Sequence, residues 1–487
     1  MIYLVGENIF SLNSGTEFSQ IQRLQALKRA GHQVKIVTRN YNRFLSQNLT
    51  QHGLDQTDSV NMYDFFQGAL DVPRKKQNLR YLKSIPLTDY HIVGIDNNLS
   101  EIRYQGKTLA KIHVMPATIG LVGDVEYLDD LGHPALREYW DWRGFKSMVE
   151  TYHPDGTVGS QRFFSPAGQP VLEITHMHIG DQVRPTMWKL IHYRGRDRIF
   201  DAEDDLFTFF LNELNRQEQA TFVSDRRSVD ANVLAVDQPV QTIAVIHSQA
   251  SNKQGVYQDY EVALNGNAAG HFTKVALPSK QEARALRKFV TYRKNLHPIM
   301  DCYYPTVGSD RQLSSQPTLV YRGMLTPVKR ITDLVRAFQL IHQQLPKARL
   351  VMQGYFTAGY QPQVSGLINQ LGLTASVDLV DYGLEPTIYD HADLFINASE
   401  NEGLGMNMVE AMSHGVPVIS YNVPDVKALL SNKALVQNAN LAALARQAVA
   451  ILGDPQGYPA RSNAARQIAA QYNETAFVKQ WEDLLKK

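Results

Sequence analysis

The sequence contains almost no cysteine and no long apolar run. Cys302 is the single cysteine in 487 residues, so no disulfide can form within the chain, and we expect a reducing compartment. No stretch approaches the roughly 18 consecutive apolar residues that a membrane-spanning helix needs. The opening residues, MIYLVGENIF, also lack the basic start and long apolar segment of a secretory signal. These absences predict a cytoplasmic protein.

The sequence also has almost no net charge. The 49 Lys and Arg residues and 48 Asp and Glu residues leave a formal charge of +1, which excludes a bulk attraction to nucleic acid. An anionic ligand must therefore be bound by a local site. The length predicts two or three domains, and a hydrophobic content of 44% is enough to give each of them a core.

Residues 1–69 and 201–300 predict one α/β domain. The strand IYLV, a loop containing Gly15, the helix TEFSQIQRLQALKRAG and the strand HQVKIVTR form the start of a doubly wound sheet. Gly15 fits a tight turn and a phosphate contact equally well. Two later strands, ATFVSDRR and TIAVIHS, end at Asp225 and His247. Ligands of such sheets bind beyond the carboxyl ends of strands, so both residues are candidates, although a charged residue after a strand is common.

Residues 70–200 have a different pattern of short alternating strands. Turn signals such as Gln105-Gly106 and Pro154-Asp155-Gly156 separate them, which predicts an inserted antiparallel β-meander. Its many aromatic residues indicate either a packed sheet face or a platform for an acceptor or a partner subunit. Three arginines near its end, at 194, 196 and 198, fit either a solvated turn or a contact with a polyanion.

Residues 301–470 predict a second α/β domain. PTLVYRGM, RLVMQG, VDLVDYG, DLFINAS and PVISYN are strand patterns joined by helical ones. The amphipathic segment ETAFVKQWEDLLKK within residues 471–487 predicts a terminal helix that packs back on the N-terminal domain. Two Rossmann-like domains that face each other across a cleft, with the meander inserted in the first, are the expected architecture.

The segment ENEGLGMNMVE places two carboxylates around the start of a helix. Glu402 follows a buried strand and precedes Gly403 and Gly405, and Glu410 lies eight positions later within the helix. The N-terminus of a helix binds phosphate, and the glycines allow a ligand to approach the backbone. Helix capping by an acidic residue explains Glu402 but not the glycines. The segment therefore predicts a nucleotide-sugar site.

This segment resembles the E-x7-E signature of the retaining glycosyltransferases of family 4, which have the GT-B fold. TPVKRITDLVRAF, with Lys329, is similar to the phosphate-binding segment of that family. The NSGTEFSQ and NMYDFFQ stretches and the β insertion resemble a narrower group from Gram-positive bacteria. That group contains the teichoic acid α-glycosyltransferases, of the poly(glycerol-phosphate) α-glucosyltransferase type, and the glycosyltransferases that modify serine-rich adhesins.

The resemblance implies a role for each residue that matches the motifs. The implied catalytic residues are His247, Glu402 and Lys329. The implied donor-binding residues are Gly15, Arg322, Lys329, Gly403, Leu404, Gly405, Met406 and Glu410. It implies no metal ligand and no cofactor beyond a nucleotide-sugar donor, UDP-glucose or UDP-N-acetylglucosamine.

The resemblance also implies a hexosyltransferase that works without a metal and modifies a cell-envelope acceptor. The first expectation for that acceptor is poly(glycerol-phosphate) wall teichoic acid, an anionic polymer, and a serine-rich protein is the second. We expect a homo-oligomer or a homologous partner subunit through the β insertion, peripheral association with the inner face of the membrane, and no nucleic acid.

Three departures from the family pattern leave an alternative open. After the strand PVISYN, the segment NVPDVKALL is shorter than the loop of the relatives and lacks their Tyr-Gly-Pro segment. Met324 stands where the family has an arginine, five residues before Lys329, and Ser248 stands where close relatives have a second histidine. Arg322 lies on the same strand face, about 7 Å from the missing charge. A loss of that charge would leave a weakly catalytic or non-catalytic partner subunit of a protein O-glycosyltransferase complex.

Overall fold

The computed structural model describes residues 1–82, 85–86, 88–308, 311–423 and 426–486, and the chain forms two compact units. The first unit comprises Met1–Ser11, Val34–Ala220 and Ala235–Val240, and the second comprises Leu12–Gln33, Thr221–Leu234 and Gln241–Lys487. The chain therefore leaves the first unit after a single strand and returns to it before it completes the second.

The first unit begins with a small parallel sheet. Its strands are β1 (Ile2–Gly6), β2 (Val34–Thr38) and β3 (Ser59–Asn61), in that order. Its helices are α2 (Leu45–Gln51), α3 (Met62–Gln67) and α4 (Glu203–Gln217). All residues of β1 are buried, as expected for a parallel strand covered on both faces.

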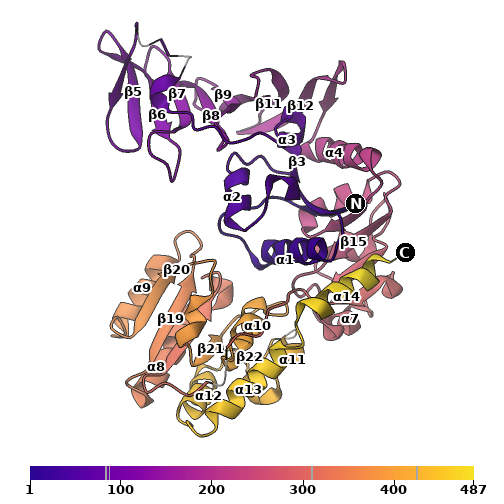
Figure 1. The fold of residues 1–487 in the computed structure, drawn as a ribbon, viewed down its shortest axis with the longest axis vertical. Coiled ribbons are helices and arrows are strands. Elements are labelled where there is room, and N and C mark those ends of the chain that lie inside the picture. Colours follow the sequence, from indigo (N-terminus) through magenta and orange to yellow (C-terminus); the bar gives the residue numbers. More distant parts are fainter. Residues whose placement is uncertain (83–84, 87, 309–310, 424–425, 487) are drawn as a thin grey trace. The chain divides into compact units, whose positions relative to one another are not determined.

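A ten-stranded antiparallel sheet forms the rest of the first unit, drawn in purple to magenta in Figure 1. Its strands pair in chain order: β4 (His91–Gly94), β5 (Leu99–Tyr104), β6 (Lys107–Val114), β7 (Val122–Leu128), β8 (Pro134–Trp140), β9 (Lys146–Tyr152), β10 (Val158–Phe164), β11 (Pro170–Ile179), β12 (Gln182–Tyr193) and β13 (Arg196–Phe200). Between β5 and β6, Gln105 and Gly106 both have positive φ, at 48° and 83°, as a two-residue hairpin turn requires. The predicted inserted meander is confirmed.

Two of the three arginines near the end of this sheet have partners in the first unit. Arg194 Nη2 lies 2.5 Å from Glu213 Oε2, and the Arg198 guanidinium lies 4.9 Å from the centre of the Phe209 ring. Their positive charges are therefore engaged within the fold.

The second unit contains two groups of parallel strands. The first group, in the order β17-β16-β15-β14, consists of β14 (Thr221–Ser224), β15 (Gln241–Val245), β16 (Lys274–Leu277) and β17 (Leu296–Pro298). The second, in the order β20-β19-β18-β21-β22-β23, consists of β18 (Thr318–Arg322), β19 (Arg349–Gly354), β20 (Val377–Asp381), β21 (Leu394–Asn397), β22 (Val418–Tyr421) and β23 (Leu435–Val436). Fully buried runs such as LFIN in β21 explain why these strands lie between helices.

Helices accompany both groups of strands in the second unit. They are α1 (Gly15–Arg29), α5 (Asp230–Leu234), α6 (Glu261–Asn265), α7 (Lys280–Leu286), α8 (Ile331–Gln344), α9 (Gln361–Gln370), α10 (Met406–Ser413), α11 (Val426–Leu429), α12 (Leu441–Leu452), α13 (Tyr458–Ala469) and α14 (Glu474–Leu485). Across the described ranges, no helix has both the length and the apolar character that crossing a bilayer demands.

The terminal helix α14 packs against α1, although more than 440 residues separate the contacts. Trp481 of α14 is 1% exposed, and the guanidinium of Arg23 in α1 lies 4.2 Å from the centre of its ring. At the end of α1, Arg29 Nε donates a hydrogen bond of 2.6 Å to Glu474. The end of the chain therefore supports the helix whose beginning faces the cavity described below.

Candidate functional site

The second unit contains a cavity of about 510 Å³. All ten residues predicted from the sequence line it: Gly15, His247, Arg322, Lys329, Glu402, Gly403, Leu404, Gly405, Met406 and Glu410. They come from four helices and strands and from two loops, so the fold brings together residues that lie almost 400 positions apart in the sequence. Their chemical roles stay predictions.

Two helix N-termini open into this cavity. At the start of α1, Ser14 and Glu17 form a capping box, in which Glu17 accepts the backbone N–H and the hydroxyl of Ser14 at 3.1 and 2.6 Å. α10 follows Gly405, whose φ of 79° is strained for other residues. A Cβ on Gly15 would lie 3.8 Å from Met406 Sδ, so the two helix starts are close together. Both present the positive end of a helix dipole, which suits a diphosphate.

Gly403 is required by a close approach of the backbone. A Cβ at this position would lie 2.0 Å from the carbonyl oxygen of His247. A contact this short with backbone cannot be relieved by rotating a side chain. Glycine therefore lets the loop before α10 press against the segment that carries His247, and both segments line the cavity.

Glu402 is held by a lysine and a serine through one of its two oxygens. Lys329 Nζ lies 2.7 Å from Glu402 Oε1, and the Ser399 hydroxyl donates to the same oxygen at 2.6 Å. Among the described residues, Oε2 of Glu402 has no hydrogen-bond partner. The carboxylate is 9% exposed and borders the cavity, so this second oxygen is the one available to a ligand.

Glu410 is held in the same way by an arginine. Arg322 Nη1 lies 2.7 Å from Glu410 Oε2, and the Tyr389 hydroxyl donates to that oxygen at 3.1 Å. Burial raises the pKa of Glu410, and the charge of Arg322 opposes this rise. In the described part of the chain, Oε1 of Glu410 accepts no hydrogen bond.

The remaining hydrogen-bonding groups of Arg322 are engaged too. Its Nη2 donates to the carbonyls of Gly383 and Leu384 at 2.7 and 3.1 Å, and its Nε donates to Gln353 at 3.1 Å. Arg322 therefore fixes Glu410 and the loop after β20. A contact with a phosphate would have to replace one of these bonds.

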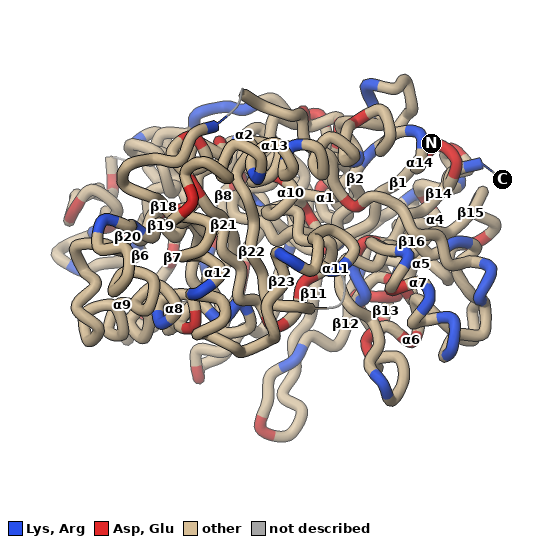
Figure 2. Tube along the Cα trace, turned by 90° about the horizontal axis from the view of Figure 1, so that it is seen from below, with Lys and Arg blue, Asp and Glu red and all other residues tan. Residues whose placement is uncertain are grey.

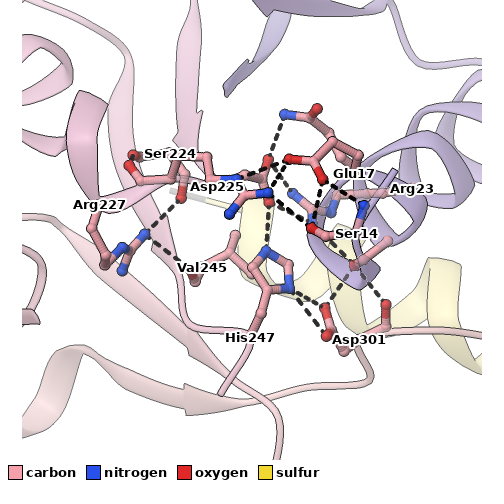
Figure 3. A network of polar contacts seen from close by, with 12 residues as sticks. Ser14, Glu17, Arg23, Ser224, Asp225, Arg227, Val245, His247 and Asp301 are labelled. Carbon is pink, nitrogen blue, oxygen red and sulfur yellow. Dashed lines mark hydrogen bonds and ion pairs between the residues drawn. The ribbon is translucent and has the colours of Figure 1, made fainter. Parts of the chain in front are cut away.

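His247 lies between two carboxylates in a buried network (Figure 3). Its Nδ1 is 2.9 Å from Asp301 Oδ1, and its Nε2 is 3.1 Å from Asp225 Oδ1. Burial lowers the pKa of His247, but the two carboxylates outweigh it and raise the pKa to about 9. Both ring nitrogens are then donors. A histidine in this state carries a positive charge and cannot accept a proton.

An arginine completes this network from α1. Arg23 Nη2 and Nη1 lie 2.8 and 3.1 Å from the two oxygens of Asp225, and Gln20 Nε2 donates to the same carboxylate at 3.0 Å. Burial raises the pKa of Asp225, but Arg23 and His247 prevail and lower it to about 2. Two cations and two carboxylates are thus buried together, with Ser19 donating to Asp301 at 2.6 Å.

Sequence analysis identified only part of this network. Asp225 and His247 were candidates because each follows a strand, whereas Arg23 and Asp301 were not recognised. Arg23 lies between Gln20 and Leu27 on the buried face of α1, and a charge on an apolar face was the signal available. Asp301 lies in a polar stretch without periodicity, which gave no signal.

Two of the three departures from the family pattern lie at the cavity. The third, NVPDVKALL, includes residues 424 and 425, which lie outside the described residues. Met324 lines the cavity, and its carbonyl accepts a hydrogen bond of 3.1 Å from the Tyr321 hydroxyl. Ser248 also lines it, with its hydroxyl 2.6 Å from that of Tyr260. In the part of the chain that the structure describes, no three His, Cys, Asp or Glu side chains are grouped as metal ligands.

Residues 310–471 match the family model described as glycosyl transferases group 1. The matched segment contains eight of the ten residues predicted from the sequence, all except Gly15 and His247. The chain is 21% identical over 442 residues to the GtfA subunit of the UDP-N-acetylglucosamine–peptide N-acetylglucosaminyltransferase of Streptococcus pneumoniae, covering 87% of this chain and 84% of that one. The poly(glycerol-phosphate) alpha-glucosyltransferase of Bacillus subtilis is 22% identical over 378 residues, covering 73% of this chain and 55% of its own length.

Solved structures show the same fold. The pneumococcal O-GlcNAc transferase GtfA, in complex with UDP and GlcNAc, matches with a TM-score of 0.86 at 16% identity, over 100% of this chain and 99% of that one. A point mutant of TarM of S. aureus, in complex with Fondaparinux, alpha-GlcNAc-glycerol and UDP, matches with a TM-score of 0.84 at 16% identity, with the same coverage. The predicted GT-B architecture is confirmed.

Proposed function

We propose that this chain is a retaining glycosyltransferase that transfers glucose or N-acetylglucosamine from a UDP-sugar to a cell-envelope acceptor. The observation that carries the proposal is the cavity itself. It is lined by two helix N-termini, by Lys329 and by two glutamates, each of which uses one carboxylate oxygen for hydrogen bonds within the described structure. Cations and helix ends suit a diphosphate, and free carboxylate oxygens suit sugar hydroxyls. The relatives and structural neighbours support it, since several are named as sugar transferases or were solved with UDP.

The donor would be held along the cavity by groups of different chemistry. The N–H groups of Gly405 and Met406 and the start of α1 at Gly15 would bind the diphosphate, and Lys329 would stabilise its charge as it departs. Glu410, fixed by Arg322, would accept the ribose hydroxyls. These groups supply the positive charge that a metal ion would otherwise supply, so we propose a metal-independent reaction.

The sugar end of the donor would lie near Glu402 and His247. Oε2 of Glu402 would accept a sugar hydroxyl, while its Oε1 keeps Lys329 in place. His247 is held as a cation by Asp225 and Asp301, so we assign it electrostatic stabilisation near the anomeric centre rather than proton abstraction. Retention would follow from attack on the face that the diphosphate leaves.

We propose poly(glycerol-phosphate) wall teichoic acid as the acceptor and the cytoplasm, at the inner face of the membrane, as the place of action. The support comes from the likeness to the Bacillus subtilis poly(glycerol-phosphate) alpha-glucosyltransferase and from the fold shared with TarM. The β insertion, as a broad antiparallel sheet, would provide the contact with a second copy or a homologous subunit.

A second candidate is a weakly catalytic or non-catalytic partner subunit of a protein O-glycosyltransferase complex. Met324, which lacks the positive charge that the family pattern has at this place, is the observation that favours it. The structural match to a chain of a GtfA/B complex, with a TM-score of 0.79 at 17% identity, shows the fold of such assemblies.

A donor experiment tests the proposal and separates the two candidates. The purified chain should bind UDP, and it should release UDP from UDP-glucose or UDP-N-acetylglucosamine when poly(glycerol phosphate) is added, with and without EDTA. Lys329→Ala and Glu402→Ala should abolish the release. UDP binding without turnover, followed by turnover only after a homologous subunit is added, would favour the second candidate. Failure to bind UDP would refute the first candidate.

A further inference from the structure

A row of exposed cations lies on the surface of the second unit. Its members are Lys280, Arg284, Arg287, Lys288, Arg293 and Lys294, and we call them the 280–294 cation row. Glu282 is the single acid in this segment, and its side chain is buried. The segment therefore carries a net charge of +5, whereas the whole chain carries +1, so the other residues sum to −4.

In the described part of the chain, these six cations have no acidic partner. Within the described ranges, none of them forms an ion pair, whereas other exposed arginines of the unit do: Arg349 lies 2.7 Å from Asp378 and Arg461 lies 2.7 Å from Asp454. Like charges four positions apart on a helix repel each other and destabilise it slightly. The repulsion between these neighbouring cations therefore slightly lowers the stability of the isolated chain.

The cations of the row are spread along the chain from α7 to the segment before β17. Ala283 and Leu286 bury one face of α7, Lys280 and Arg284 lie one turn apart and are exposed, and Arg287 and Lys288 follow the end of the helix. Residues four apart on a helix rise by about 6 Å, so the charges of Lys280 and Arg284 are spaced along the helix. Blue segments lie beside the label of α7 in Figure 2. In the chain, Arg293 and Lys294 lie between α7 and β17. A linear set of solvated charges suits a polyanion, whereas a single phosphate needs converging donors.

The segment that carries the row contacts a segment that leads from the cavity. β16 ends just before α7 and pairs in parallel with β15, whose end leads to His247. The backbone N–H of Ala250, two residues after the cavity-lining Ser248, donates to the carboxylate of Glu282 at 2.9 Å. A polymer held along the cation row is thus directed to the edge where the sugar is expected.

We propose that the 280–294 cation row is the docking track for a linear polyphosphodiester acceptor with the chemistry of poly(glycerol phosphate). This inference rests on the proposed function, because a track needs a transfer site at its end. A membrane surface fits the row less well, since Phe289, at 38% exposure, is the single large apolar side chain exposed within it.

The experiment neutralises three cations of the row. The test variant is Arg284→Gln/Arg287→Gln/Lys288→Gln. The matched control, Lys347→Gln/Lys433→Gln/Arg446→Gln, makes the same charge change at exposed residues of the same unit that are also without an ion pair in the described structure. Binding to defined poly(glycerol phosphate) chains is measured over a range of salt concentrations, together with UDP affinity and the KM for polymer.

We expect the test variant to bind the polymer about 10- to 100-fold more weakly, and its salt dependence to flatten by about two units in the logarithmic slope. UDP affinity and kcat stay at the wild-type value, and the control variant behaves as wild type. Equal losses in both variants, or no loss in the test variant, would overturn the proposal. So would a loss of binding to phosphatidylglycerol vesicles with unchanged polymer binding, which would assign the row to a membrane. A wild-type chain that binds no UDP refutes the proposed function, whereas one that binds UDP but ignores the polymer refutes this inference alone.

Discussion

The charge on His247 should make the stability of the second unit depend on pH. The pKa of this histidine is raised from 6.5 to about 9, because Asp301 and Asp225 outweigh the cost of its burial. A base whose pKa is raised on folding stabilises the folded state fully below its unfolded pKa. That stabilisation is lost as the pH rises through the folded pKa. The protein should therefore become less stable between pH 6.5 and pH values somewhat above 9.

The expected size of this loss follows from the pKa difference. A difference of about 2.5 units corresponds to about 3 kcal/mol of unfolding free energy at about 1.36 kcal/mol per unit. The imidazole is 12% exposed, so solvent screens the pair only slightly. His247→Gln removes the titrating group and should remove this slope, although it also lowers the stability at every pH. Asp301→Asn keeps an acceptor for Ser19 and should move the loss to lower pH.

Trp481 offers a signal from the second unit alone. It packs on Arg23 within the network, whereas Trp140, Trp142 and Trp188 belong to the first unit. Urea denaturation followed by fluorine NMR of a 5-fluorotryptophan-labelled chain would monitor its resonance, assigned by substituting the other tryptophans in turn. His391→Gln, at an exposed histidine of the same unit, is the control and should keep the wild-type slope. Equal pH slopes for wild type and His247→Gln would show that this imidazole is not held as a cation.

Three further substitutions test the cavity. Met324→Arg should restore a cation about 4 Å from the diphosphate, and the attraction between them would contribute up to about 4 kcal/mol. The variant should therefore raise kcat/KM by up to about a thousandfold. Unchanged kinetics would place the diphosphate elsewhere. Arg322→Lys cannot reproduce the contacts with Glu410 and Gly383, so the KM for the donor should rise about 10- to 100-fold in steady-state assays, and a wild-type KM would contradict this role. Gly403→Ala should lower the free energy of unfolding by about 1–3 kcal/mol, lower the midpoint of thermal unfolding and abolish UDP binding. Gly366→Ala is the control, because a Cβ there meets open space, and it should change neither.

Local signals in the sequence predicted most of the elements, and together with the family resemblance they indicated residues that line the cavity. The strand before Glu402, the two glycines and the start of α10 lie within a dozen residues, so each constrains the next. The hairpin turns of the insertion were readable for the same reason, because Gln105-Gly106 determines its turn without help from distant parts of the chain. Placing Gly15 beside Met406 needed more, and there the family resemblance supplied what spacing could not.

Contacts between distant segments could not be predicted. Arg23 meets Asp225 across 202 positions, and His247 meets Asp301 across 54, and no periodicity links such pairs. Asp301 and Tyr304 lie in a polar stretch without helix or strand periodicity, and both line the cavity. The sequence shows a cluster of arginines that includes Arg194 and Arg198, but both have partners in the described structure. The 280–294 cation row, by contrast, has no ion pair among the described residues. A cluster of charge in sequence becomes meaningful only once its partners are known.

The pairing of each glutamate with a cation has a physical consequence for ligand binding. Each glutamate uses one oxygen to hold a cation, Lys329 for Glu402 and Arg322 for Glu410, at the same distance of 2.7 Å. A lysine alone at this edge would be mobile and would attract any anion, whereas a lysine held by a carboxylate is ordered and locally neutral. Under the proposed function, a diphosphate would compete with Glu402 for Lys329, and the hydroxyls of a nucleotide-sugar would satisfy the oxygens that remain. The pairing would then favour a sugar-linked diphosphate over inorganic phosphate, and Glu402→Gln should reduce this selectivity by loosening Lys329 rather than by removing a contact with the phosphates.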